Sequence, residues 1–337
     1  MHGKAFWKGG TFMSKHIATT DQNRAPLYQV LPLDTPFGIT ISPCNICDFR
    51  CIYCGQGDEQ RTASMLTLEQ FRVLANQLAA FPQTIKQVSF VANGETILNP
   101  ELPDMIALIK QRGLAGQVKV ITNANRLTHT YADRLINAGL DNLKVSLQGI
   151  TSEKYQKICK TVVDFDRLKE QLFYFYEHRK QCSLHIKVID IALDEGEEEQ
   201  FYQMFDGHAD SIFVEQCIGE YALHPEESSN KFQFNTSHMQ TCSLPFYTLF
   251  IDDFGDVFPC CLTNRYETSA RPMGNIFDKP IKDIWDEEFA ALQKSLLKKQ
   301  TPTCAICQGC KRFISYSKPS DIIDGHEQEI ANKMKKA

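Results

Sequence analysis

The sequence lacks an excess of positive charge, a long hydrophobic run and any low-complexity segment. Its 36 Lys and Arg residues are outnumbered by 41 Asp and Glu residues, and no basic stripe is available to neutralise phosphates, which argues against nucleic acid as a partner. No apolar run is long enough to span a bilayer, and the N-terminal segment has no apolar stretch of signal-peptide length. We therefore expect a cytoplasmic protein without nucleic-acid or membrane partners, whose 337 residues suffice for a large domain and a smaller one.

Cysteine, by contrast, is abundant, with 13 residues. Disulfides need an oxidising compartment and nothing in the sequence directs export, so metal binding explains the cysteines better. Most of them form two groups along the chain: Cys44, Cys47, Cys51 and Cys54, then Cys242, Cys260, Cys261, Cys304, Cys307 and Cys310. Cys159, Cys182 and Cys217 stand alone, and a lone cysteine is most often a small buried hydrophobic residue.

Short apolar runs alternate with helical patterns from residue 39 to about 216. The expected strands are 38–42, 87–91, 118–122, 142–146, 184–189 and 211–215. Helices, in which apolar residues recur at three- and four-residue spacing, are expected over 67–80, 102–112, 131–138, 165–179 and 197–205. Six strand–helix units predict a parallel sheet, because parallel neighbours need crossover helices. Such sheets place their chemistry after the carboxyl ends of the strands, where the first cysteine group lies.

The pattern changes beyond Cys217. Residues 246–260 predict a β-hairpin around an Asp-Phe-Gly-Asp turn, and a helix is expected near 281–297, ahead of the cysteine-rich segment 303–310. We expect the residues before about Pro32 to be loosely structured and the charged tail after about Ser317 to be peripheral.

The first cysteine group contains a C-x3-C-x2-C array in Cys47, Cys51 and Cys54. Three thiolates on one short loop can hold three irons of a cubane cluster and leave the fourth iron without a protein ligand. An open coordination position distinguishes a catalytic metal site from a closed structural one. The alternative on spacing alone is a structural zinc site completed by Cys44.

The segment CDFRCIYC resembles the cluster loop of radical S-adenosylmethionine (SAM) enzymes, in which an aromatic residue, here Tyr53, precedes the third cysteine. The resemblance implies an α/β fold with a partial (β/α)6 barrel, in which Cys47, Cys51 and Cys54 ligate a [4Fe–4S] cluster. The open iron would chelate SAM, and one electron from a flavodoxin- or ferredoxin-type reductant would cleave SAM to methionine and a 5′-deoxyadenosyl radical. That radical abstracts hydrogen from the substrate, so the cofactor carries the hard chemistry.

Later segments resemble the family's SAM-contacting segments, in the same order. Asn93-Gly94-Glu95 is similar to the Gly-Gly-Glu element that meets the methionine amino group, with Asn93 in place of the first glycine. Thr122-Asn123 and Ser146-Leu147-Gln148 resemble positions that touch the ribose or the carboxylate. The resemblance thus implies cofactor contacts from Tyr53, Asn93, Gly94, Glu95, Asn123, Ser146 and Gln148. Many relatives have an arginine where this chain has Cys159, so Lys157 or Lys160 substitutes for it, or neither does.

The second cysteine group resembles the SPASM/twitch extension found on many radical SAM enzymes. Full SPASM domains carry more cysteines and two auxiliary clusters, so the resemblance implies a small α+β extension with one auxiliary [4Fe–4S] cluster, as in the twitch variant. The expected ligands are Cys242, Cys260, Cys304 and Cys307, with Cys310 as the replacement and Cys261 as a bystander; a structural zinc ribbon is the alternative. The implied organisation is an N-terminal extension over 1–36, the barrel over 37–217, the auxiliary-cluster domain over 218–315 and a tail over 316–337.

The resemblance leaves the reaction open. Fewer than forty residues precede the expected barrel, too few for the peptide-binding domain of many peptide-modifying relatives, and the compact size is similar to that of radical enzymes acting on carbohydrates. We expect oxidation or epimerisation of a carbohydrate-type carbon, with modification of a peptide substrate as the alternative and a non-catalytic iron–sulfur electron carrier as a distant third. Epimerisation requires a hydrogen donor, and Cys217, next to Glu215 and Gln216 at the end of the last strand, is the candidate catalytic thiol.

Overall fold

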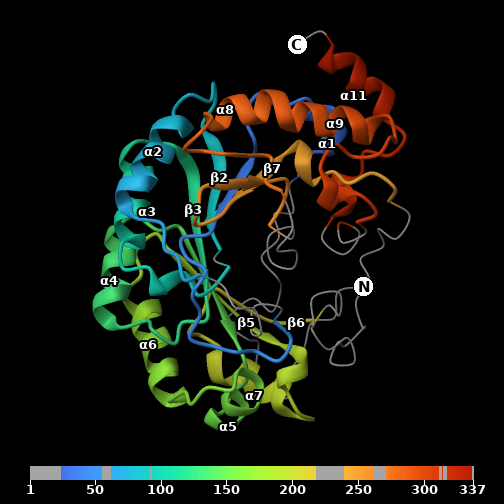
Figure 1. Ribbon diagram of the computed structural model, residues 1–337. Helices are drawn as coiled ribbons and strands as arrows, with labels where there is room; N and C mark the ends of the chain where they lie inside the picture. The colour runs from blue at the N-terminus through green and yellow to red at the C-terminus, as the bar shows by residue number, and fades with distance from the viewer. Residues whose placement is uncertain are drawn as a thin grey trace.

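A curved sheet of nine strands organises the protein. The computed structural model describes residues 24–54, 62–91, 93–217, 239–261, 271–310, 313 and 317–335. The strand order is β6-β5-β4-β3-β2-β1-β7-β8-β9, and in Figure 1 helices α2, α3, α4 and α6 cover the outer side of the arc. The strands are β1 Gly38–Ile41, β2 Ile85–Phe90, β3 Ala115–Thr122, β4 Asn142–Leu147, β5 Ser183–Ile189, β6 Ser211–Glu215, β7 Thr248–Ile251, β8 Asp256–Phe258 and β9 Gly274–Asn275.

The first six strands are all parallel, as predicted. The helices between them are α2 Leu68–Leu78, α3 Leu102–Gln111, α4 His129–Asn137, α5 Ser152–Cys159, α6 Phe165–His178 and α7 Glu197–Phe205. Five of the six were predicted; α5 was missed, although Thr151 caps it by accepting a hydrogen bond from the Lys154 N–H. Short 3-10 segments lie at Thr96–Leu98, Asp190–Ala192, Leu244–Phe246, Ala305–Cys307 and Pro319–Asp321.

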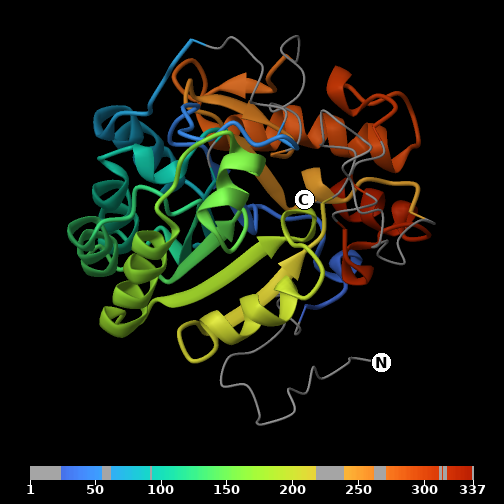
Figure 2. The same cartoon turned by 90° about the horizontal axis from the view of Figure 1, so that it is seen from below.

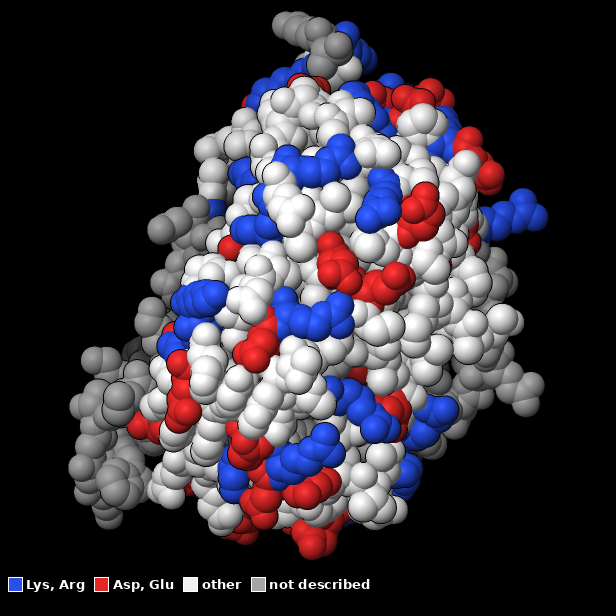
Figure 3. All heavy atoms as spheres, turned by 90° about the vertical axis from the view of Figure 1, so that its left-hand side faces the viewer, with Lys and Arg blue, Asp and Glu red and all other residues white. Residues whose placement is uncertain are grey.

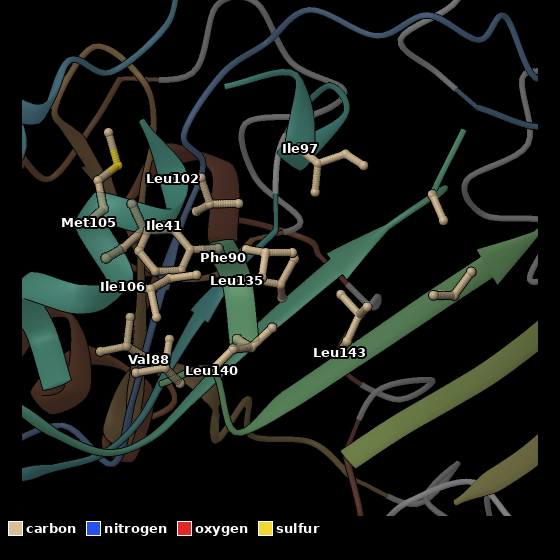
Figure 4. Close-up of a cluster of buried hydrophobic side chains, with 14 of the residues drawn as sticks. Ile41, Val88, Phe90, Ile97, Leu102, Met105, Ile106, Leu135, Leu140 and Leu143 are labelled. Carbon is tan, nitrogen blue, oxygen red and sulfur yellow. The ribbon is translucent and has the colours of Figure 1, made fainter. Parts of the chain in front are cut away.

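The main core lies between the parallel strands and the outer helices. Figure 4 shows Val88 and Phe90 of β2 facing Met105 and Ile106 of α3, with Leu143 of β4 nearby, and all five are fully buried. Side chains of a strand alternate between the two faces of a sheet. The strand residues between these apolar positions therefore face the inside of the arc.

The predicted hairpin is present, since β7 and β8 pair antiparallel. In addition, β7 pairs parallel with β1, so the sheet runs without a break from the predicted barrel into the predicted extension. The expected helix near 281–297 is continuous through α8 Ile281–Ile284, a π-helical turn over Trp285–Phe289 and α9 Ala290–Leu297. In Figure 2, seen from below, β5 and β6 (yellow-green to yellow) run side by side across the view.

The two end segments pack together, contrary to the sequence-based expectation. Helices α1 Leu27–Val30 and α11 Glu327–Met334 belong to a small second core, whose buried members are Leu27, Leu31, Phe246, Leu297, Ile323 and Ile330. The prediction of a loosely structured segment before Pro32 and a peripheral tail after Ser317 was wrong for residues 24–31 and 317–335. Each segment contributes only a few apolar residues, which become a core only when the two segments meet.

The outer helical face is an ordinary charged surface. Lys and Arg side chains alternate there with Asp and Glu side chains (Figure 3), in keeping with the net charge of -5. Among the described residues, no helix is both long and apolar enough to cross a bilayer.

Candidate active site and auxiliary cluster site

The cysteine loop follows β1 at its carboxyl end and is held from two sides. On one side the Ser42 hydroxyl donates to the Cys44 carbonyl and accepts from the Asn93 N–H, both at 2.9 Å. On the other side the N–H groups of Arg50 and Ile52 donate to carbonyls at the end of α5, each at 2.9 Å. The loop is therefore fixed between the segment after β2 and the C-terminus of α5.

Cys47, Cys51 and Cys54 lie together on this loop and are half-buried. Burial raises the pKa of the Cys47 thiol above its ordinary range, and the charge of Cys51 raises that pKa further, so the two thiols are electrostatic neighbours. No three His, Cys, Asp or Glu side chains of the described ranges are close enough to hold a single metal ion. A cubane attaches each thiolate to a different iron, and three thiols spread along one loop fit that demand better than they fit one zinc ion.

Two further cysteines surround the loop. Cys44 is fully buried, and its thiol donates to the Glu95 carbonyl at 3.1 Å; burial raises its pKa to about 12. These contacts make Cys44 a structural thiol rather than the fourth ligand of a zinc site. Cys159 is also fully buried, with its sulfur 3.7 Å from that of Cys51, a neighbour that sequence reasoning did not identify.

Glu95 links the loop after β2 to the end of β3. Its carboxylate accepts hydrogen bonds from the Ile97 N–H at 3.1 Å, the Asn123 N–H at 2.7 Å and the Thr122 hydroxyl. Burial raises the Glu95 pKa to about 7. Gly94 beside it touches the cysteine loop, where a Cβ atom would lie 2.0 Å from the Ile46 carbonyl oxygen.

The residues expected to contact SAM converge at this edge of the sheet. Tyr53 donates through its hydroxyl to the Gln148 side chain, whose amide group donates to the Ser146 carbonyl at 3.2 Å. Asn93 is 1% exposed, and its Oδ1 atom is a buried acceptor without a hydrogen-bond partner in the described part of the chain. An orphaned acceptor beside the cysteine loop fits the amino group of SAM, which would donate to it.

Asp48, inside the C-x3-C spacing, is a positioning residue that the sequence reasoning missed. Its carboxylate accepts from the Asn123 amide at 3.0 Å and the Asn125 amide at 2.7 Å, and it pairs with Arg126 at 3.1 Å. The cysteine loop is thereby tied to the segment after β3. An acidic residue between two cluster cysteines was the available signal.

The second cysteine group surrounds a cavity of about 370 Å³. Four of the cysteines line it: Cys242, Cys260, Cys307 and Cys310. Cys304 is buried beside them as the hydrogen-bond partner of the Cys307 thiol, and Cys261 packs against the adjoining apolar cluster. Four thiols around one cavity are the ligand set of a [4Fe–4S] cluster.

Cys217 lies just beyond β6. It is 4% exposed, and its N–H donates to the Asp190 carboxylate at 2.9 Å, which fixes the backbone at the carboxyl end of the last parallel strand. Glu215, two residues earlier, is the last residue of β6.

Known proteins resemble both halves of the chain. The sequence matches the radical SAM superfamily over residues 41–201 and the SPASM iron–sulfur cluster-binding domain over residues 242–311. A probable GTP 3′,8-cyclase of Methanococcus maripaludis is 28% identical over 123 residues, covering 36% of this chain and 39% of that protein. The GTP 3′,8-cyclase of Rhizobium etli is 26% identical over 193 residues, covering 54% of this chain and 52% of that protein. The chain thus spans about two fifths to half of the length of these relatives.

A solved structure extends the similarity to the fold. Streptococcus suis SuiB bound to S-adenosylmethionine superimposes with a TM-score of 0.60 at 14% identity, covering 86% of this chain and 76% of SuiB. The two matched regions contain the two cysteine groups of the structure, one on the loop after β1 and the other around the C-terminal cavity. The chain belongs to the radical SAM superfamily and carries a C-terminal SPASM iron–sulfur domain, and its cofactors are SAM, the [4Fe–4S] cluster that binds it and an auxiliary [4Fe–4S] cluster.

Proposed function

We propose that the protein abstracts hydrogen from a carbohydrate-type carbon of a small polar substrate, which it then oxidises or epimerises. The observation that carries this proposal is the polar inner face of the sheet. There the His185 ring is 2.8 Å from the Ser211 hydroxyl, and Gln87 donates to the Ser89 hydroxyl at 2.8 Å. Hydrogen-bonding side chains in a ligand site favour a hydroxylated substrate over an apolar one.

Each set of site residues has a role in this proposal. Cys47, Cys51 and Cys54 hold the cluster at which bound SAM supplies the hydrogen-abstracting radical. The Asn93 side chain accepts from the SAM amino group, while Glu95 positions the end of β3 through its hydrogen bonds to Thr122 and Asn123. Further contacts to SAM come from residues at the same edge of the sheet, Tyr53, Gly94, Asn123, Ser146 and Gln148.

The auxiliary cluster is held by Cys242, Cys260 and Cys307 together with a fourth thiol. Cys310 lines the cavity and Cys304 contacts the Cys307 thiol, so the cavity favours Cys310 as the fourth ligand over Cys304, the choice from spacing. When bound there, such a cluster would supply an electron acceptor for an oxidation.

The named relatives support a small polar substrate, because GTP is a phosphorylated ribonucleoside and therefore contains a carbohydrate. Peptide modification is the second candidate. It is favoured by the shared fold with Streptococcus suis SuiB bound to precursor peptide SuiA, at a TM-score of 0.52 and 18% identity.

The radical chemistry is tested by SAM turnover. Anaerobically reconstituted protein given a strong reductant should form 5′-deoxyadenosine, and Cys47→Ala, Cys51→Ala or Cys54→Ala should each abolish it. Cys44→Ala is the matched control, because Cys44 contacts backbone carbonyls instead, and it should keep most of the turnover. An essential Cys44 together with a dispensable Cys47 would contradict the assignment.

The type of reaction is tested at Cys217, with sugar phosphates, nucleotide sugars and peptides as candidate substrates. If the protein epimerises, Cys217→Ala should still form 5′-deoxyadenosine but give little inverted product, and wild-type product made in deuterated water should carry one deuterium. If it oxidises, Cys217→Ala should change the rate only modestly, while Cys242→Ala should stop product formation. Turnover of peptides alone would replace the carbohydrate proposal with peptide modification.

A further inference from the structure

Three lysines lie on the inner face of neighbouring strands: Lys119 on β3, Lys144 on β4 and Lys187 on β5, here named the lysine cluster. The residues that flank each of them along its strand are fully buried in the main core. The lysines alternate with these residues and so point to the opposite side of the sheet, into the arc. In the strand register Lys144 pairs with His185, and Lys187 pairs with Ser146, one of the residues expected to contact SAM.

The amino groups of the lysine cluster converge. Lys119 and Lys144 are side-chain hydrogen-bond partners, and the positive charge of Lys187 acts on both. Lys187 forms an ion pair with Glu215, whose side chain is 44% exposed, so the cluster is open to solvent on that side. The Lys144 ammonium is 5.4 Å from the centre of the Phe213 ring. Glu215 is also the carboxylate whose charge acts on Lys119 and Lys144.

This arrangement is costly when nothing negative is bound, because burial and like charges both disfavour the charged form of a lysine. Burial, together with the charges of Lys119 and Lys187, lowers the pKa of Lys144 to about 7. His185 does not add to the positive charge near neutral pH, since burial lowers its pKa to about 4. Packing of the fold does not explain why three amino groups converge here. An anion bound among them would offset the repulsion between their positive charges.

We propose that the lysine cluster binds a phosphoryl group of the substrate and holds the substrate beside the end of β4, where Ser146 and Gln148 are expected to contact SAM. When all three lysines are protonated, their charge exceeds that of Glu215 by two, and the charge of Lys318 also acts on Lys119. An anion bound among the lysines would favour this protonated state. A phosphate monoester carries close to two negative charges at neutral pH, whereas a carboxylate carries one. This inference rests on the proposed function and narrows its substrate class to phosphorylated small molecules, such as sugar phosphates or nucleotide-linked sugars.

The proposal is tested by anaerobic calorimetry, which measures the affinity of the reconstituted holoenzyme for inorganic diphosphate with SAM present. Lys119→Met and Lys144→Met remove one charge each at nearly constant size, and each should weaken diphosphate binding at least tenfold. Lys169→Met, on the outer face of α6 and paired with Asp166, is the matched control and should bind diphosphate as the wild type does.

Glu215→Gln should change the affinity for diphosphate in the opposite direction from the two lysine variants. It removes the carboxylate that competes for Lys187, so diphosphate binding should tighten several-fold, a result that a misfolded variant could not produce. Undetectable binding of diphosphate to the wild type, or unchanged affinity in both lysine variants, would overturn the proposal. Malonate that binds as tightly as diphosphate would overturn the phosphoryl assignment in favour of a carboxylate.

Formation of 5′-deoxyadenosine in the same samples separates this inference from the proposed function. If the wild-type protein binds diphosphate through the lysine cluster but never cleaves SAM, the anion site is supported and the proposed radical chemistry is refuted. A wild type that cleaves SAM but does not bind diphosphate would refute the anion site alone.

Discussion

Gly94 shows how closely the segment expected to contact SAM approaches the cysteine loop. The Glu95 N–H donates to the Ile46 carbonyl at 2.7 Å, and a side chain at residue 94 would collide with the backbone of Ile46. Gly94→Ala should therefore displace the loop, lower the stability by about 1–3 kcal/mol and reduce 5′-deoxyadenosine formation at least tenfold.

The control for this change is Gly38→Ala on β1. A Cβ atom there would lie 3.6 Å from the Thr248 hydroxyl, an ordinary contact, so SAM turnover should stay within a factor of two of the wild type. Equal activity of the two variants would show that the Gly94 contact does not position the cluster loop. Turnover and iron content, measured on the same anaerobic samples, decide between these outcomes.

At the scale of the element, the turn between β7 and β8 contains a buried acid. Asp252 accepts hydrogen bonds from the N–H groups of Phe254 and Asp256, both at 2.9 Å. Burial, and then the charges of Asp253 and Asp256, raises its pKa to about 7. The folded protein thus favours the neutral acid, and the stability that this group contributes is lost as pH rises from its ordinary pKa of about 4 through 7.

Asp252→Asn keeps the acceptor oxygen of the turn and carries no charge at any pH. Relative to this variant, the wild type should lose up to about 1 kcal/mol of unfolding free energy per pH unit between pH 5 and 7, and the difference should level off above pH 7. Anaerobic urea unfolding at pH 5, 6, 7 and 8 measures it. Parallel pH profiles for the two proteins would refute the raised pKa.

At the scale of the whole molecule, the two cysteine groups are expected to load independently. One lies on the loop after β1 and the other around the cavity lined by Cys242, Cys260, Cys307 and Cys310. Two cubanes predict about eight irons per chain, and the triple Cys47/Cys51/Cys54→Ala variant should retain about half of them. Metal analysis by mass spectrometry checks this, and zinc in place of the remaining iron would identify the C-terminal site as structural.

The sequence by itself determined the features that depend on residues close together in the chain. The six parallel strands follow from short apolar runs, and the start of α2 follows from Thr67 and Gln70, which form a capping box in the structure. The spacing of Cys47, Cys51 and Cys54 predicted the cluster loop for the same reason, since these three proposed ligands lie within eight residues.

Only the tertiary structure decided the features that join distant segments. It paired β7 with β1, packed α1 and α11 into one core, and placed Cys159 beside Cys51. It also brought the lysine cluster together from three strands, although each lysine by itself is an ordinary polar residue in an alternating pattern. The periodicity of one strand predicts which of its side chains share a face of the sheet. Which side chains from different strands meet depends on the curvature of the sheet and the register between the strands.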